Sequence, residues 1–165
     1  MRAKQIQQVL KPLQQSSSQV FLGQGIHTLG LLGWILEQTG PADVAVTTFS
    51  TSDAFLCGVI NLRKRGLINH STLVADIKAS SKTLKLKRLM TEAFDDVRLT
   101  LNHSKNMLVS NAEWLVSVIT SQNQTYGDRA ECTFISLDRD VYLDIHNMLN
   151  NLLDDKTTIS IPRRE

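Results

Sequence analysis

The stretch that decides the fold runs from residue 102 to residue 131 and reads NHSKNMLVSNAEWLVSVITSQNQTYGDRAE. Short runs rich in apolar and β-branched residues predict strands over 104–109, 114–120 and 130–136. The links between these runs leave no room for a crossover helix, so we expect the strands to be neighbours or antiparallel. Polar residues stand at the strand ends, which makes this stretch the first place to look for a site.

Five polar residues in this stretch have types that suit chemistry on a phosphodiester. His103 and Lys105 are two positions apart, so on a strand both would project from the same face. A neutral imidazole can act as a nucleophile or base, and an ammonium beside it can bind a phosphate oxygen. Ser121 and Asn123 repeat the spacing and can donate to phosphoryl oxygens or orient the histidine. Glu131 opens the next strand and can hold one imidazole tautomer.

The order of these residues resembles the phospholipase D superfamily, above all its small members with one such motif per chain, which are nucleases. The resemblance covers residues 19–153. The family pattern is H-x-K, four residues and an aspartate, followed later by Gly-Ser-x-Asn. This chain has Ser110 at the aspartate position, where Asn111 is a candidate substitute, and Thr120 at the glycine position, so the motif is degenerate. A β-branched residue at the glycine position is expected to crowd the turn.

The resemblance implies a covalent mechanism without a metal or other cofactor. His103 would attack the phosphorus to form a phosphohistidine, a second histidine would protonate the leaving oxygen, and water would release the phosphate. Lys105 and Asn123 would neutralise charge on the non-bridging oxygens. The other histidines of the chain lack an H-x-K context: His27, His70 and His146. A homodimer with His103 from each chain is therefore expected.

The rest of the sequence predicts an α/β domain with a mixed β-sheet flanked by helices. Further strands are expected over 19–22, 42–49, 71–76, 97–101 and 157–161, and helices over 26–38, 51–65, 80–94 and 138–153. Helical links predict parallel strands in the first half of the chain. The last helix is expected to turn five residues to the core: Val141, Ile145, Met148, Leu149 and Leu152. The expected boundaries are an N-terminal helix and linker over 1–18 and a phospholipase D-like domain over 19–165.

The composition of the chain limits the number of domains, the kind of partner and the cellular location that we expect. The 165 residues, 42% of them hydrophobic, suffice for one domain with its own core. No apolar run reaches the roughly 20 residues of a membrane span, and no signal peptide is seen, so we expect a cytoplasmic protein without a membrane partner. Cys57 and Cys132 are expected to be reduced, buried thiols.

The net charge of +2 is compatible with nucleic acid without demanding it. Basic residues gather in three runs, at 63–65, between 78 and 88, and at 163–164, and they favour nucleic acid over lipid as the phosphodiester. Two functions therefore remain open. One is a metal-independent nuclease acting on DNA or RNA. The other is a catalytically impaired module that binds nucleic acid or a partner protein, because Ser110 and Thr120 depart from the family pattern.

Overall fold

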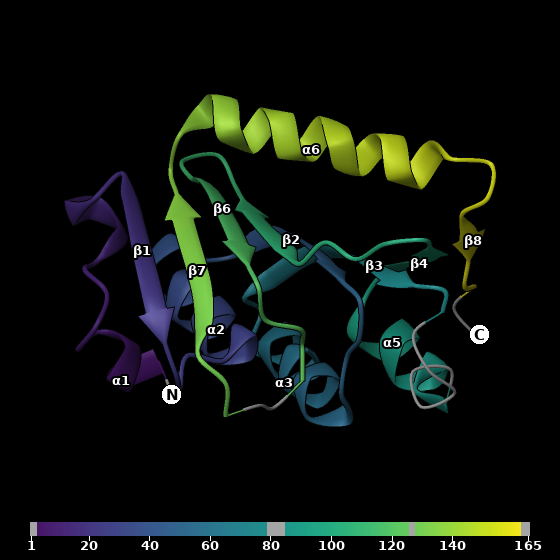
Figure 1. Cartoon of the computed structure of the whole chain (residues 1–165), viewed down its shortest axis with the longest axis horizontal. Coiled ribbons are helices and arrows are strands. Elements are labelled where there is room, and N and C mark those ends of the chain that lie inside the picture. Colours follow the sequence, from purple (N-terminus) through teal and green to yellow (C-terminus); the bar gives the residue numbers. More distant parts are fainter. Residues whose placement is uncertain (1–2, 79–84, 126–127, 163–165) are drawn as a thin grey trace.

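A computed structural model describes residues 3–78, 85–125 and 128–162, which form a mixed β-sheet with helices on both faces (Figure 1). The strands stand in the order β1-β7-β6-β5-β2-β3-β4-β8. Their bounds are β1 Ser18–Gly23, β2 Ala42–Thr48, β3 Ile68–Asp76, β4 Asp96–Thr100, β5 Asn106–Ser110, β6 Leu115–Thr120, β7 Glu131–Ser136 and β8 Ile159–Ser160. The helices are α1 Ala3–Ile6, the 3-10 turn η1 Leu13–Gln15, α2 Thr28–Thr39, α3 Asp53–Lys64, α5 Lys87–Ala93 and α6 Arg139–Asp154.

The sheet has a parallel half and an antiparallel half, which confirms the predicted fold class. Strands β2, β3 and β4 are parallel and are linked through α3 and α5. Strands β5, β6, β7 and β1 alternate in direction, and β5 joins the two halves by pairing with β2. Consecutive strands β4 and β5 are therefore separated by β2 and β3. The short link between them must cross the carboxyl ends of both.

Local sequence signals explain where helix α3 begins and ends and where helix α6 begins. Ser52 caps α3 by accepting a hydrogen bond from the Phe55 amide at 3.3 Å. Gly66 follows that helix with a φ of 72°, a conformation that favours glycine. Asp138 caps α6 by accepting from the amides of Asp140 at 2.8 Å and Val141 at 3.1 Å. These capping residues lie where the sequence predicted helix starts.

Each face of the sheet is covered differently. Helices α2, α3 and α5 pack on one face, and α6 lies alone across the other (Figure 1). The first face holds the larger core, which includes Trp34, Leu56 and Phe94. Under α6 only a narrow stripe is buried, centred on Tyr142 and Leu149. The burial expected along α6 is thus too wide. Met148 lines a hollow between α6 and the sheet together with Leu149 and Leu152, but the residue remains 64% exposed.

The N-terminal segment is not the single helix that was expected before the linker. Helix α1 ends at Ile6, and the chain resumes helical geometry only in the 3-10 turn after Pro12. Proline lacks an amide hydrogen and its ring clashes with a preceding helical turn, so a helix cannot run through it undisturbed. Ile6, Leu10 and Leu13 are nevertheless buried in the main core. The segment therefore packs as part of the same hydrophobic unit as α2.

Two further expectations need comment. The burial predicted for the cysteines is wrong, since Cys57 on α3 and Cys132 on β7 are both exposed free thiols. Both stand in apolar runs, but on the side of their element that faces away from the core. The predicted start of the helix at residues 80–81 lies outside the described residues, and its described part is α5.

Candidate active site

The candidate residues meet at one edge of the sheet. Strands β1, β2, β3, β4 and β6 end there, and β5 and β7 begin there, as their pairing registers require. In open α/β sheets ligands bind outside the carboxyl ends of the parallel strands, where the strand order reverses. Here that reversal falls at β2, whose neighbours are β3 on one side and β5 on the other.

His103 and Lys105 lie in the link before β5, not within it. Strand β5 begins only at Asn106, so the prediction of a strand from residue 104 was wrong at its start. The Lys105 ammonium folds back onto the same link and donates to the backbone carbonyl oxygen of His103 at 2.7 Å. The Lys105 Nζ also lies 3.4 Å from the His103 Nδ1. His103 is exposed, and its ring packs beside that of Phe49 with centroids 5.0 Å apart.

Ser121 and Glu131 form a second contact pair at this edge. The Ser121 hydroxyl donates a short hydrogen bond to the Glu131 Oε2 and accepts one from the Cys132 amide at 3.0 Å. The Ser121 amide in turn donates to the Cys132 carbonyl at 3.0 Å. These bonds continue the pairing of β6 with β7 beyond its last residue. They fix the serine hydroxyl and the glutamate carboxylate relative to each other.

Electrostatics connect the two pairs. Partial burial lowers the pKa of the Lys105 ammonium from its usual value, because desolvation disfavours the charged form. The Glu131 carboxylate acts in the opposite direction and raises the pKa of Lys105. The site therefore places a lysine that is partly stripped of water within the field of one carboxylate. Such a lysine gains more from an arriving phosphate than a fully solvated one would.

Asn123 occupies the same edge without a described contact to the other four candidates. Its Oδ1 is buried and has no hydrogen-bond partner among the described residues. The next residue, Gln124, ties this segment to the end of β2, since its amide donates to the Ser50 carbonyl at 3.2 Å and it bridges to Thr51. The backbone of this segment thus holds Asn123 near the site, and its side-chain Oδ1 has no partner among the described residues.

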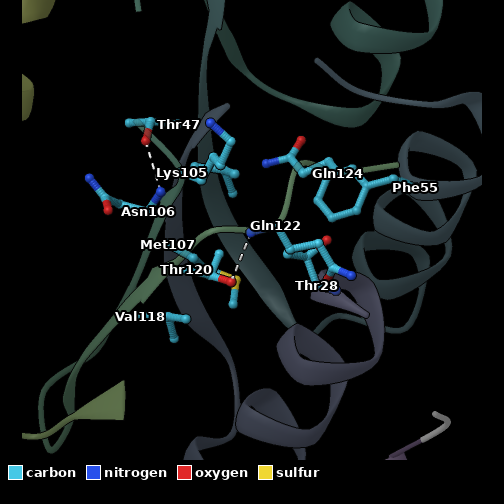
Figure 2. Close-up of a pocket in the computed structure, with 11 residues that line it drawn as sticks. Thr28, Thr47, Phe55, Lys105, Asn106, Met107, Val118, Thr120, Gln122 and Gln124 are labelled. Carbon is cyan, nitrogen blue, oxygen red and sulfur yellow. Dashed lines mark hydrogen bonds between the residues drawn. The ribbon is translucent and has the colours of Figure 1, made fainter. Parts of the chain in front are cut away.

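A small pocket opens beside Lys105, as Figure 2 shows. Thr28 at the start of α2 and Phe55 on α3 form one wall, and Gln122 and Gln124 another. The Gln122 side-chain oxygen accepts from the Thr28 amide at 3.0 Å, which joins the residue 121–125 segment to α2. The pocket is too small for a nucleotide.

The two departures from the family pattern have clear structural settings. Thr120 fits at the glycine position without a positive φ, and its hydroxyl donates to the Cys132 carbonyl at 3.0 Å. The expected crowding is therefore not found. Ser110 ends β5 at the opposite edge of the sheet, about 16 Å along the chain from Lys105 at strand rise. Asn111 bonds to the carbonyls of Thr39 and Pro41 there, so it shapes a turn and is remote from His103.

Sequence reasoning missed the residues that support the candidate site. Phe49 directly follows β2, a position that sequence could have flagged, because aromatic residues after a parallel strand lie at the carboxyl edge. Asn102 and Asp76 form a buried network beneath His103 that only the fold brings together.

No group of three or more histidine, cysteine, aspartate or glutamate side chains within the described ranges could hold a metal ion. In those ranges no helix has the length and apolar character to cross a membrane.

The fold is that of a phospholipase D-like α/β domain. No family model matches the sequence, and no curated protein does. Solved structures do match. The chain is similar to Nuc from Salmonella typhimurium, a phospholipase D family member, with a TM-score of 0.65 and 13% identity over 87% of this chain and 97% of that one. The resemblance inferred from the motif is thereby confirmed for the fold.

Two other solved structures widen the comparison. NucT from Helicobacter pylori matches with a TM-score of 0.61 and 11% identity, covering 86% of this chain and 97% of that chain. TrmBL2, an archaeal chromatin protein described as having a novel mode of DNA binding, matches with a TM-score of 0.56 and 10% identity over 92% and 60% of the two chains. At these identities the likeness establishes the fold alone.

Proposed function

We propose that this chain is a metal-independent phosphodiesterase, a nuclease acting on DNA or RNA, with His103 as its nucleophile. The observation that carries the proposal is the pairing of an exposed His103 with Lys105 at the carboxyl edge, beside the Ser121–Glu131 pair. This edge presents a nucleophile, a cation and hydrogen-bonding groups from consecutive segments. The likeness of the fold to Nuc and NucT adds support.

The proposed reaction is balanced without a cofactor. The Nε2 of His103 attacks the phosphorus while the bond to the leaving oxygen breaks, and that oxygen takes a proton from a second imidazolium. Water then gives its proton to the same imidazole and attacks the phosphorus, which breaks the P–N bond. For Nε2 to attack, its lone pair must be free, so the proton must stand on Nδ1. Lys105 cannot accept that proton, and it must therefore leave Nδ1 for a phosphate oxygen when substrate binds.

Glu131 and Asn123 have defined parts in this proposal. Once Lys105 has moved, the Nδ1 proton of His103 needs an acceptor, and the carboxylate of Glu131 serves as one and holds the tautomer. The side-chain amide nitrogen of Asn123 donates to a non-bridging oxygen. The hydroxyl of Ser121 is occupied by Glu131, so its first role is to orient that carboxylate.

Nucleic acid is the proposed substrate because exposed cations follow β3 at this edge and recur at the start of α5. Lys78 follows β3 at the same edge and is exposed. Lys85, Lys87 and Arg88 continue the basic run and are also exposed. A polymer with one charge per phosphate gains from such an extended set, whereas a single headgroup uses only one or two of its members.

A second copy of the chain is proposed to supply the second histidine. Val20, Leu22 and Ile119 are apolar and 66%, 75% and 42% exposed. The pairing registers place them around Phe134 on one face of the antiparallel half, beyond the part that α6 covers. A contiguous apolar surface of this kind is typical of an interface. Leu22→Ser should convert dimer to monomer in sedimentation velocity, while Val9→Ser, at a separate exposed position, should not.

The nuclease proposal is tested by incubating the protein with single-stranded DNA, duplex DNA and RNA in EDTA. Wild type should cleave at least one of them, and His103→Ala should abolish cleavage. His70→Ala is the matched control, because His70 is also an exposed histidine but stands at the opposite edge. Equal cleavage by wild type and His103→Ala would refute the role of His103.

The alternative is a binding module that has lost turnover. It is favoured because, in the free chain, the Lys105 ammonium is hydrogen-bonded to the His103 carbonyl and the Ser121 hydroxyl is hydrogen-bonded to Glu131. The fold's likeness to a chromatin protein is compatible with it. Salt-dependent DNA binding without cleavage, unchanged by His103→Ala, would identify this second function.

A further inference from the structure

The link that carries His103 is short, yet it crosses the ends of two strands. Residues 101–105 connect β4 to β5 across the ends of β3 and β2, and they present His103 to solvent. An exposed link with so few backbone bonds of its own would ordinarily be mobile. A nucleophile must instead be held to within about half an ångström of its working position. The residues on either side of His103 hold the link in place through hydrogen bonds to the sheet.

Asn102 ties the link to the sheet below. It is only 5% exposed, and its side-chain amide donates to the Thr48 carbonyl at 3.3 Å and the Val74 carbonyl at 3.4 Å. Thr48 ends β2 and Val74 lies two residues before the end of β3, and these are the two strands that the link crosses. The Asn102 side-chain oxygen accepts from the Ser104 amide at 3.0 Å. One side chain therefore fixes both the sheet below and the residue after His103.

Asp76 holds the backbone of the same link. Its carboxylate, in a residue only 7% exposed, accepts from the Asn102 amide at 2.8 Å and from the Lys78 amide at 2.6 Å. A buried carboxylate is costly unless such donors surround it, so its position is strongly determined. It anchors the link at the point where regular pairing between β3 and β4 stops.

Thr47 completes the support on the other side of His103. The Ser104 hydroxyl is hydrogen-bonded to the Thr47 hydroxyl at 2.8 Å and to the Asn102 side-chain oxygen at 2.5 Å. The Thr47 oxygen also accepts from the Asn106 amide at 2.9 Å. His103 is thus an exposed residue between two neighbours whose side chains are bonded into the sheet.

We propose that Asn102 and Asp76 form a latch that positions His103 for attack. The proposal rests on the proposed function in so far as positioning is measured by catalysis. The latch acts through the backbone of residues 102–104 and touches no reacting atom, so Asn102 and Asp76 are positioning residues. The hydrogen bonds of Asn102 and Asp76 are directional, so they specify the path of the link. Apolar side chains at these positions would not specify it.

The test uses Asn102→Ala and Asp76→Asn in the full chain, with Asp95→Asn as the matched control. Asp95 is also a carboxylate that accepts from a backbone amide, that of Ser71 at 2.9 Å, but it stands at the opposite edge. In hydrolysis of bis(p-nitrophenyl) phosphate, the latch variants should lose about 10–100-fold in kcat with KM nearly unchanged, since small misplacements of a reacting group cost this much. The control variant should keep the wild-type kcat.

Amide hydrogen exchange gives a readout that does not need turnover. In wild type the Asn102 and Ser104 amides should exchange slowly, and both latch variants should speed their exchange while leaving core strand amides unchanged. Fast exchange of both amides in wild type would overturn the latch, and so would a latch variant that loses protection but keeps the control's kcat. If wild type hydrolyses nothing, the proposed function fails, and the exchange result alone decides for or against the latch.

Discussion

Replacing Asp95 with alanine should destabilise the parallel half of the sheet by about 2–4 kcal/mol. Its Oδ1 accepts from the Arg63 guanidinium at 2.6 Å, and its Oδ2 accepts from the Ser71 amide at 2.9 Å and hydroxyl at 3.0 Å. Hydrogen bonds to a charged group contribute about 1.5–3 kcal/mol each. Both charged side chains are 21% exposed, and Arg63 keeps bonds to Ser71 and Ala93, so the sum is discounted.

The pH dependence of this effect has a defined sign. Burial alone would raise the pKa of Asp95, but hydrogen bonds from Arg63 and Ser71 and the charge of Arg63 hold it below its ordinary value. Asp95 therefore stabilises the fold above its unfolded-state pKa of about 3.9, and this contribution is lost as the pH falls through the lower, folded-state value.

Urea denaturation followed by circular dichroism measures both statements. The difference in unfolding free energy between wild type and Asp95→Ala should be full at pH 7 and should shrink in acid below about pH 4. A difference under about 0.5 kcal/mol at pH 7 would refute the assigned network, since this is the usual range of surface substitutions. A difference that stays constant into strong acid would refute the electrostatic part.

Substitutions at three further positions test the sheet and the site. Thr120→Gly, which restores the family residue, should lower the free energy of unfolding by about 1–2 kcal/mol, because the threonine hydroxyl bonds to a β7 carbonyl and glycine weakens a strand; unchanged stability would contradict this. Glu131→Gln should lower the pKa of Lys105 further, as followed by NMR titration, and a raised value would show the charge is misassigned. Ser110→Asp should destabilise the chain by about 0.5–1 kcal/mol while Ser110→Asn does not, because Asp43 stands directly opposite in β2 and like charges repel. Equal stability of these two variants would count against that pairing register.

The sequence predicted the elements whose patterns are local. The apolar runs after Lys105 and before Ser121 are strands because their alternation and β-branched content suit a half-buried sheet. The order of the candidate residues followed from the motif, and the structure brings four of them into two pairs at one edge. Boundaries were less accurate, as the late start of β5 and the interruption at Pro12 show.

What the sequence did not contain was the arrangement of distant segments. Nothing local indicates that β5 leaves β4 to pair with β2, so the crossing path of the His103 link was not predictable. The support from Asp76 to Asn102 depends on that path. The exposure of Met148 and Cys132 likewise depends on α6 covering only part of its face of the sheet. Periodicity predicts that an element has an apolar side. How much of that side is buried depends on which other elements pack against it in the tertiary structure.

The proposed reaction requires a covalent bond between His103 and phosphorus during turnover. Rapid quenching at alkaline pH during hydrolysis of bis(p-nitrophenyl) phosphate in EDTA, followed by peptide mass spectrometry, tests it most directly. An acid-labile p-nitrophenyl phosphate adduct should appear on the peptide that contains His103, form at least as fast as turnover and be absent from His103→Ala. Hydrolysis that proceeds without this adduct, or that continues unchanged in His103→Ala, would contradict it.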